Sequence, residues 1–191
     1  MKTQHLLLPL ASLIFTFILS GCANAPSHLI IAPELITLSA NQHINQQATL
    51  NVVDMRTANH IVQILRTAEA ATLFSAQDRL EDIIKKSLSK HWQQQGLTIQ
   101  TSAVNTINIA IEKAVISVTQ ETMSYQVQTE IVLKVTINNS VQTLTSTFKN
   151  RGNSKGPFQA DVAVFERNFN QRLANLLQQI LANEKINNFL K

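Results

Sequence analysis

The sequence predicts an α+β fold: a two-layer sandwich in which two long amphipathic helices pack on one face of a mostly antiparallel sheet. The first observation is the alternation of apolar and polar residues over 123–137, the period of a strand with one face buried and the other in water. The second is a pair of apolar stripes that repeat every three or four residues over 75–95 and 161–183. Because an amphipathic helix must bury its stripe, we expect both helices to cover the sheet.

The chain begins with the three parts of an export signal. Lys2 precedes an uncharged apolar run, 6–19, which is shorter than the about 20 residues that a helix needs to cross a bilayer. Small residues and the single cysteine of the chain follow, and together they match the bacterial lipobox, Leu19-Ser20-Gly21-Cys22. We interpret 1–21 as a lipoprotein signal peptide that is removed, and expect the signal peptidase to recognise the residues before the cysteine, Leu19, Ser20 and Gly21.

Cys22 is the predicted lipidation site. Its thiol accepts a diacylglyceryl group and its freed amine a further acyl chain such as palmitate, and two or more chains hold a protein stably on a membrane. The alternative is an unmodified cysteine after an ordinary secretory signal. Residues 22–28 would form a short tether, and Ala23 in place of Asp favours the outer membrane, with the domain facing the periplasm.

Residues 29–191 are expected to form a single α+β domain. In its first half we predict an apolar edge strand or arm interrupted by Pro33, then a strand and a small hairpin, at 29–38, 50–56, 61–66 and 70–74. Ser75 is expected to cap the first helix, 75–95, and Gly96 to end it in a left-handed turn. The stripe of this helix comprises Leu80, Ile83, Ile84, Leu88 and Trp92.

In the second half the period changes from that of a helix to that of a strand. We expect strands at 97–101, 106–119, 123–137 and 141–149. A slip of the alternation near Lys113 indicates a bulge, and Asn138-Asn139 predicts a tight turn with positive φ. The segment 150–157 is expected to be a loop, after which Asp161 caps the second helix, 161–183, and a short terminal turn follows at 186–190.

Residues that usually carry catalysis or bind metals are scattered along the chain. No Gly-x-Ser-x-Gly turn or phosphate-binding glycine loop occurs, and the histidines of the mature chain lack the spacing of a metal site: His28, His43, His60 and His91, the last expected at the edge of the core. We therefore predict that the protein is not an enzyme and needs no metal or cofactor. The net charge of +4 is too small to indicate a nucleic-acid binder.

Two pairs of charged residues are the nearest approach to a polar site. Asp54 and Arg56 lie at the end of a predicted strand and could form an ion pair or a polar contact. They could have a binding role, but we favour the interpretation as a surface strand exit. Glu112 and Glu130 could face each other across neighbouring strands as a carboxylate pair, or lie separately on the solvated face of the sheet.

Binding is the remaining class of function. Lys149, Arg151 and Lys155 form a basic stretch without an intervening acid, which could contact an anionic membrane or polysaccharide, or simply be a solvated loop. The polar face of the sheet, rich in Gln and Thr, could bind a partner protein or an added strand. A small ligand would instead need a pocket between the helices and the sheet, near aromatic residues that are otherwise core: Trp92, Tyr125, Phe165 and Phe169.

Several stretches together resemble the YajG family of bacterial lipoproteins. They are the lipobox LSGC, the strand end 52–56 (VVDMR), the segment 156–160 (GPFQA) and the ending 188–191 (NFLK), in the same order over about 22–190. The resemblance implies an envelope lipoprotein with no accepted reaction, cofactor or catalytic residue, and carries over only Cys22, as the lipidated residue.

The sequence thus predicts a membrane-anchored envelope lipoprotein of unknown molecular activity. The leading hypothesis is a non-enzymatic protein-binding or assembly module at the outer membrane, anchored through acylated Cys22 and working with an envelope protein partner. The alternative is a binder of a small envelope ligand, such as a lipid or a peptidoglycan fragment. Neither hypothesis specifies an oligomeric state.

Overall fold

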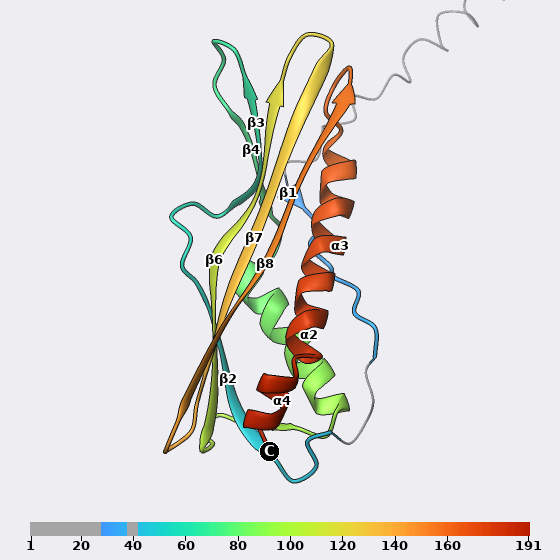
Figure 1. Ribbon diagram of the computed structural model, residues 1–191. Helices are drawn as coiled ribbons and strands as arrows, with labels where there is room; N and C mark the ends of the chain where they lie inside the picture. The colour runs from blue at the N-terminus through green and yellow to red at the C-terminus, as the bar shows by residue number, and fades with distance from the viewer. Residues whose placement is uncertain (1–27, 38–41) are drawn as a thin grey trace, which may run out of the picture.

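The computed structural model describes residues 28–37 and 42–191 (Figure 1). The predicted signal peptide, 1–21, with Leu19, Ser20 and Gly21, and the predicted lipidation site Cys22 lie outside the described residues. The elements in chain order are β1 (His28–Leu29), β2 (Gln47–Asp54), β3 (His60–Arg66), β4 (Thr72–Ala76), α2 (Leu80–Gln94), β5 (Thr98–Ile99), β6 (Asn105–Gln120), β7 (Ser124–Asn138), β8 (Thr143–Pro157), α3 (Val162–Leu181) and α4 (Glu184–Phe189).

The predicted two-layer sandwich is wrong. Strands make up 44% of the described residues and helices 26%, and the strands form one curled, mixed sheet shaped like half a barrel (Figure 1). The parallel pairs are β1–β4, β2–β5, β2–β6 and β3–β6, and the antiparallel pairs are β3–β4, β6–β7 and β7–β8. The helices differ in length and pack on different parts of the sheet, α2 against β2 and β5 and α3 against β7 and β8. Periodicity shows which residues face a core, but it does not contain the direction of the neighbouring strand.

Three long strands, β6, β7 and β8, are the frame of the sheet. The predicted alternation of β7 is confirmed, since Val127, Thr129, Ile131 and the following alternate residues are buried. The predicted bulge is also confirmed, as a register shift between Ile111 and Lys113 in the β6–β7 pairing. The predicted loop 150–157 is wrong, because these residues continue β8 and pair with β7 as far as Pro157.

β8 contains two glycines at positions where the side chain of a neighbouring element lies against the strand. Gly156 pairs with Tyr125, and a Cβ at Gly156 would lie 2.5 Å from the Tyr125 ring, which itself packs edge-on against Phe165 of α3 with ring centroids 6.0 Å apart. A Cβ at Gly152 would meet the guanidinium of Arg172. Glycine therefore leaves room here for a neighbouring side chain, rather than for an unusual backbone angle.

Two strands share the edge of β6 that faces away from β7. β2 pairs with residues 105–111 and β3 with residues 116–120, both parallel to β6. Residues 55–59, between β2 and β3, leave the sheet. The side chain of Arg56 lies in the resulting gap beside β6, where its Nη1 donates to the carbonyl oxygens of Ala114 at 3.0 Å and His60 at 3.2 Å. The guanidinium also forms a two-point ion pair with Asp54, with distances of 2.7 and 2.9 Å.

The predicted helix ends are partly confirmed. Asp161 caps α3 and accepts a hydrogen bond from the backbone N–H of Ala163 at 2.9 Å, and Gly96 after α2 has a φ of 93°. Ser75 is not a cap, because it belongs to β4, and α2 begins at Leu80 after Arg79, which makes no side-chain capping bond. The β7–β8 turn does not use positive φ; instead Asn139 Oδ1 accepts from the backbone N–H of Val141 and Gln142.

The first prediction concerns Arg56. We expect Arg56→Gln to lower the free energy of unfolding by about 3 kcal/mol, because it leaves the largely buried Asp54 carboxylate without its cation. Arg66→Gln is the matched control: Arg66 makes an exposed ion pair with Glu69 at 4.0 Å, and its loss should cost under about 1 kcal/mol. Urea unfolding measures both, and equal losses would contradict this role for Arg56.

The same ion pair predicts a pH dependence. Burial alone raises the pKa of Asp54, but the hydrogen bonds and the charge of Arg56 outweigh it and hold the pKa below its ordinary value of 3.8. A carboxyl group with a lowered folded pKa stabilises the fold above its unfolded pKa, and this stabilisation is lost as the pH falls through the folded pKa. The stability difference between the wild type and Asp54→Asn should therefore be full at neutral pH and shrink below about pH 4.

The second prediction compares the two glycines of β8. Gly156→Ala should destabilise the protein by about 1–3 kcal/mol, since the Tyr125 ring must leave its contact with Phe165. Gly152→Ala should cost less, because the guanidinium of Arg172 ends a flexible side chain and can turn away. Thermal unfolding of both variants measures the difference, and the reverse order would show that Tyr125 moves more easily than Arg172.

Candidate functional site

The candidate site is the segment 30–37, here called the arm, together with the groove beside it. The arm follows β1 and runs along α3 as an extended chain (Figure 1). Leu29 and Ile31 face the core and Leu35 packs against it, whereas Ile30 and Ile36 are exposed. This alternation is that of a strand, yet from residue 30 onward no strand of the described part of the chain pairs with the arm.

Polar side chains of α3 take the place of the missing strand. Glu166 Oε2 accepts from the N–H of Ile30 at 2.8 Å, and Gln178 Oε1 accepts from the N–H of Ile36 at 3.1 Å. Between them Asn170 bonds twice, accepting from the N–H of Ala32 at 2.9 Å and donating to the carbonyl of Ile30 at 2.9 Å.

The spacing of these side chains explains the fit. Residues 166, 170 and 178 fall on the same side of a helix, because they are separated by multiples of four. The bonded amides of residues 30, 32 and 36 all lie on one edge of an extended chain. This ladder is not among the features predicted from the sequence, although the alternation of 29–35 and the polar row beside the apolar stripe of α3 are signals of it.

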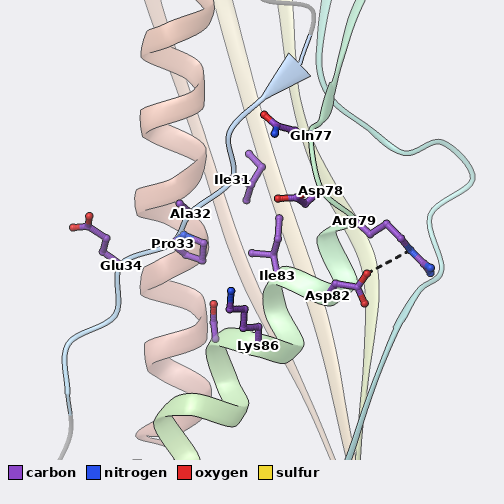
Figure 2. Close-up of a pocket in the computed structure, with 11 residues that line it drawn as sticks. Ile31, Ala32, Pro33, Glu34, Gln77, Asp78, Arg79, Asp82, Ile83 and Lys86 are labelled. Atoms are coloured by element: carbon purple, nitrogen blue, oxygen red, sulfur yellow. Dashed lines mark ion pairs between the residues drawn. The ribbon is translucent and has the colours of Figure 1, made fainter.

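A groove of about 680 Å³ lies between the arm and the first turns of α2 (Figure 2). Ile31 and Pro33 of the arm and Ile83 of α2 supply its apolar lining. Charged residues surround them: Glu34, Asp78, Arg79, Asp82 and Lys86. Arg79 is engaged with Glu81 and with Asp82 at 3.8 Å, and the hydrogen bond and charge of Glu81 raise its pKa.

The predicted basic stretch lies on β8 rather than in a loop. Lys149, Arg151 and Lys155 alternate along the strand and are all exposed on one side of the sheet. Arg151 has an acidic partner on the neighbouring strand, since Glu130 of β7 accepts hydrogen bonds from Arg151 at 2.7 Å and from Lys113 of β6 at 2.8 Å. The hydrogen bonds of Lys113 and then Arg151 lower the pKa of Glu130.

Glu112 and Glu130 do not face each other across neighbouring strands, so they do not form a carboxylate pair. Glu130 pairs with Val115 in the β6–β7 register, and Glu112 lies in the bulge. An ion-paired carboxylate of lowered pKa is a poor proton donor near neutral pH. This arrangement stabilises the sheet face rather than offering an acid and a base.

The histidines are also separated. His43 lies in the polar segment between the arm and β2 and is fully buried, with Nε2 3.2 Å from Asn187 Oδ1 of α4, and burial lowers its pKa. His91 is partly buried with Nδ1 2.8 Å from the carbonyl oxygen of Ser87, and His60 lies in β3. Among residues 28–37 and 42–191, no group of three His, Cys, Asp or Glu side chains could hold a metal ion.

The aromatic residues considered for a ligand pocket belong to the core. Trp92, Phe165 and Phe169 are at most 2% exposed, and Tyr125 packs against them through Phe165. Neither they nor the basic residues of β8 line the groove beside the arm. Within the part of the chain that the structure describes, no helix has the length and apolarity to span a bilayer.

The third prediction concerns the ladder. Asn170→Ala removes two hydrogen bonds to the arm, and each is worth about 0.5–1.5 kcal/mol. We expect faster amide hydrogen exchange at Ala32 and cleavage of the arm by proteases, with little change in the exchange of β7. The control is Asn175→Ala, on the same helix near the arm but outside the ladder. Unchanged protection of Ala32 in Asn170→Ala would contradict the ladder.

Comparison with known proteins agrees with this architecture. The chain is similar to the uncharacterized lipoprotein YajG of Escherichia coli strains K12 and O6:H1, at 22% identity over 98% of the chain and 97% of the relative. Its fold is similar to that of protein XCC0632 from Xanthomonas campestris, with a TM-score of 0.62, 11% identity, and coverage of 86% of this chain and 97% of the other. A family model described as uncharacterized lipoprotein matches residues 33–191, so the chain belongs to this lipoprotein family, as its resemblance to the YajG family predicted.

Proposed function

We propose that this lipoprotein is a non-enzymatic binding module of the outer membrane. In this proposal residues 1–21 are removed, Cys22 is acylated, and the domain 29–191 faces the periplasm and binds an envelope protein. Membership of a lipoprotein family supports a lipid anchor. Ala23 after the cysteine supports the outer membrane, and the absence of an acid–base arrangement among the candidate residues supports binding rather than catalysis.

The observation that carries the proposal is the exposed face of β6, β7 and β8. Thr145, Thr147, Lys149 and Arg151 follow one another at alternate positions of β8, and all are exposed. Gln126, Gln128 and Lys134 extend the same face over β7. Long paired strands hold this surface rigidly, and among the described residues β8 is an edge strand that pairs only with β7. A rigid surface with many hydrogen-bonding groups suits a protein partner.

A second candidate function is supported by the groove beside the arm. Its volume of about 680 Å³ is within the range of about 300–1,000 Å³ of small-molecule sites. Ile31, Pro33 and Ile83 could bind an apolar portion of a ligand, and Lys86 an acidic group. In this second candidate function, a lipid or peptidoglycan fragment would bind in the groove beside the arm rather than between the helices and the sheet near the aromatic residues.

The fourth prediction tests the anchor and then the binding face. Cys22→Ala should move the protein from the membrane fraction to the soluble fraction, since an unacylated chain has no membrane anchor. Ser27→Ala, which changes the tether alone, should leave the protein on the membrane. Mass spectrometry of the N-terminal peptide reports the acyl groups, and an unmodified Cys22 in the wild type would contradict the anchor.

Photocrosslinking in cells then separates the two candidate functions. A photoreactive residue at Thr147 probes the sheet face, and one at Ser87 probes the groove. A single envelope protein captured from Thr147 supports the binding module. A lipid or glycan captured from Ser87, with no protein captured from Thr147, supports the ligand binder and contradicts the leading proposal.

A further inference from the structure

Two large apolar side chains stand exposed together at one end of the sheet. Met123, in the β6–β7 turn, is 68% exposed, and Phe158, just after β8, is 66% exposed. They are neighbours, because Ser124 pairs with Pro157 and the N–H of Phe158 donates to the carbonyl of Met123 at 2.9 Å. Single exposed apolar residues are common, but an adjacent methionine and phenylalanine form a small apolar tip.

Phe158 has an unfavourable backbone conformation at this tip. Its φ is 62°, in the left-handed region that bulky residues rarely adopt. Such a conformation is strained, and the exposed ring recovers little of that strain by packing within the domain. A contact outside the domain would give this exposed ring a packing partner.

The first described strand, β1, has its amino end directed toward the end of the sheet where the tip lies. β1 is parallel to β4, and β4 runs away from the β3–β4 turn, so the amino end of β1 points toward that turn. The turn is level with the tip, because Arg66 at the end of β3 pairs with Gln120 at the end of β6. The arm agrees, since it runs from Glu166 toward Gln178 and so begins near the first turns of α3, which follow Phe158 (Figure 1).

The length of chain before His28 then limits where an anchor can be. His28 and His60 both pair with Ser75, so these two residues lie at the same level of the sheet. From His60 to Arg66, β3 extends by about 20 Å toward the tip, at about 3.3 Å per residue. Residues 22–27 span at most about 20 Å even when fully extended. Cys22 can therefore lie no farther beyond His28 than about the level of the tip, so a bilayer that holds its acyl chains would lie against this end of the sheet.

We propose that the Met123–Phe158 tip docks on the membrane that holds the lipid anchor, with both side chains inserted at the interface. This inference rests on the proposed lipidation of Cys22. Aromatic and other large apolar side chains are favourable at the boundary between headgroups and acyl chains. Glu69 and Glu121 accompany Arg66 at this end, so apolar insertion rather than attraction to anionic lipid drives the docking.

The fifth prediction tests the docking in the full lipidated protein. Cys22 is the only cysteine and would be acylated, so an introduced cysteine is the single reactive thiol. Thr122→Cys places an environment-sensitive fluorophore beside the tip, and Gln142→Cys places one in the β7–β8 turn at the opposite end. In phosphatidylcholine vesicles that contain spin-labelled lipid, we expect quenching and a blue shift at residue 122 and neither at residue 142.

A variant of the tip shows which side chains are responsible. Met123→Gln with Phe158→Asn removes both apolar groups, and Asn tolerates positive φ, so the fold should be retained. In the Thr122→Cys background it should abolish the quenching, whereas Val141→Gln, an exposed apolar residue at the other end, should leave it unchanged. Added phosphatidylglycerol should have little effect.

Flotation of the same vesicles separates this inference from the proposal beneath it. Protein that does not float lacks the lipid anchor, and the anchor proposal is then wrong. Protein that floats but shows no quenching at residue 122, or equal quenching at residues 122 and 142, overturns the docking of the tip and leaves the anchor intact. Quenching that survives the double variant overturns the role of Met123 and Phe158.

Discussion

The Arg56 guanidinium fills the gap between β2 and β3 along the edge of β6. β2 and β3 both pair with β6 in the same direction, and the chain must leave the sheet between them. The carbonyl of Ala114 on the edge of β6 would have no donor from a strand there, and an unpaired buried carbonyl is costly. Arg56 supplies that donor, and Asp54 neutralises the charge, so an ion pair replaces a missing piece of strand.

The arm solves a similar problem with a helix. An extended chain normally satisfies its amides with a neighbouring strand, but the arm lies on α3, whose backbone is already bonded internally. Glu166, Asn170 and Gln178 provide the acceptors instead. As a result the arm is fixed to α3 by side-chain hydrogen bonds, although α3 offers it no free backbone partners.

Charge on the sheet face follows strand pairing rather than sequence order. Lys149, Arg151 and Lys155 have no acid between them along the chain, but in the sheet Glu130 stands opposite Arg151 and within reach of Lys113. The face is therefore a mixed polar surface with local neutralisation. This favours specific contacts with a polar partner over general attraction to an anionic surface.

The sequence by itself determined the features that depend on neighbours along the chain. The apolar stripes of α2 and α3, the buried face of β7, the bulge before Lys113 and the Asp161 cap follow from periodicity and local hydrogen bonding. The signal peptide and Cys22 are predictions of the same local kind. Family membership agrees with them at the level of a lipoprotein.

Only the tertiary structure decided which distant segments meet. The parallel pairing of β2 and β3 with β6, the continuation of β8 through Gly152 and Gly156, and the burial of His43 against α4 depend on partners far away in the chain. Ser75 looked like a helix cap because its local sequence suits one, but pairing with β3 kept it in a strand. Periodicity shows which side of a segment is buried, whereas the choice of partner is a competition between distant surfaces, which is settled only when the whole chain packs.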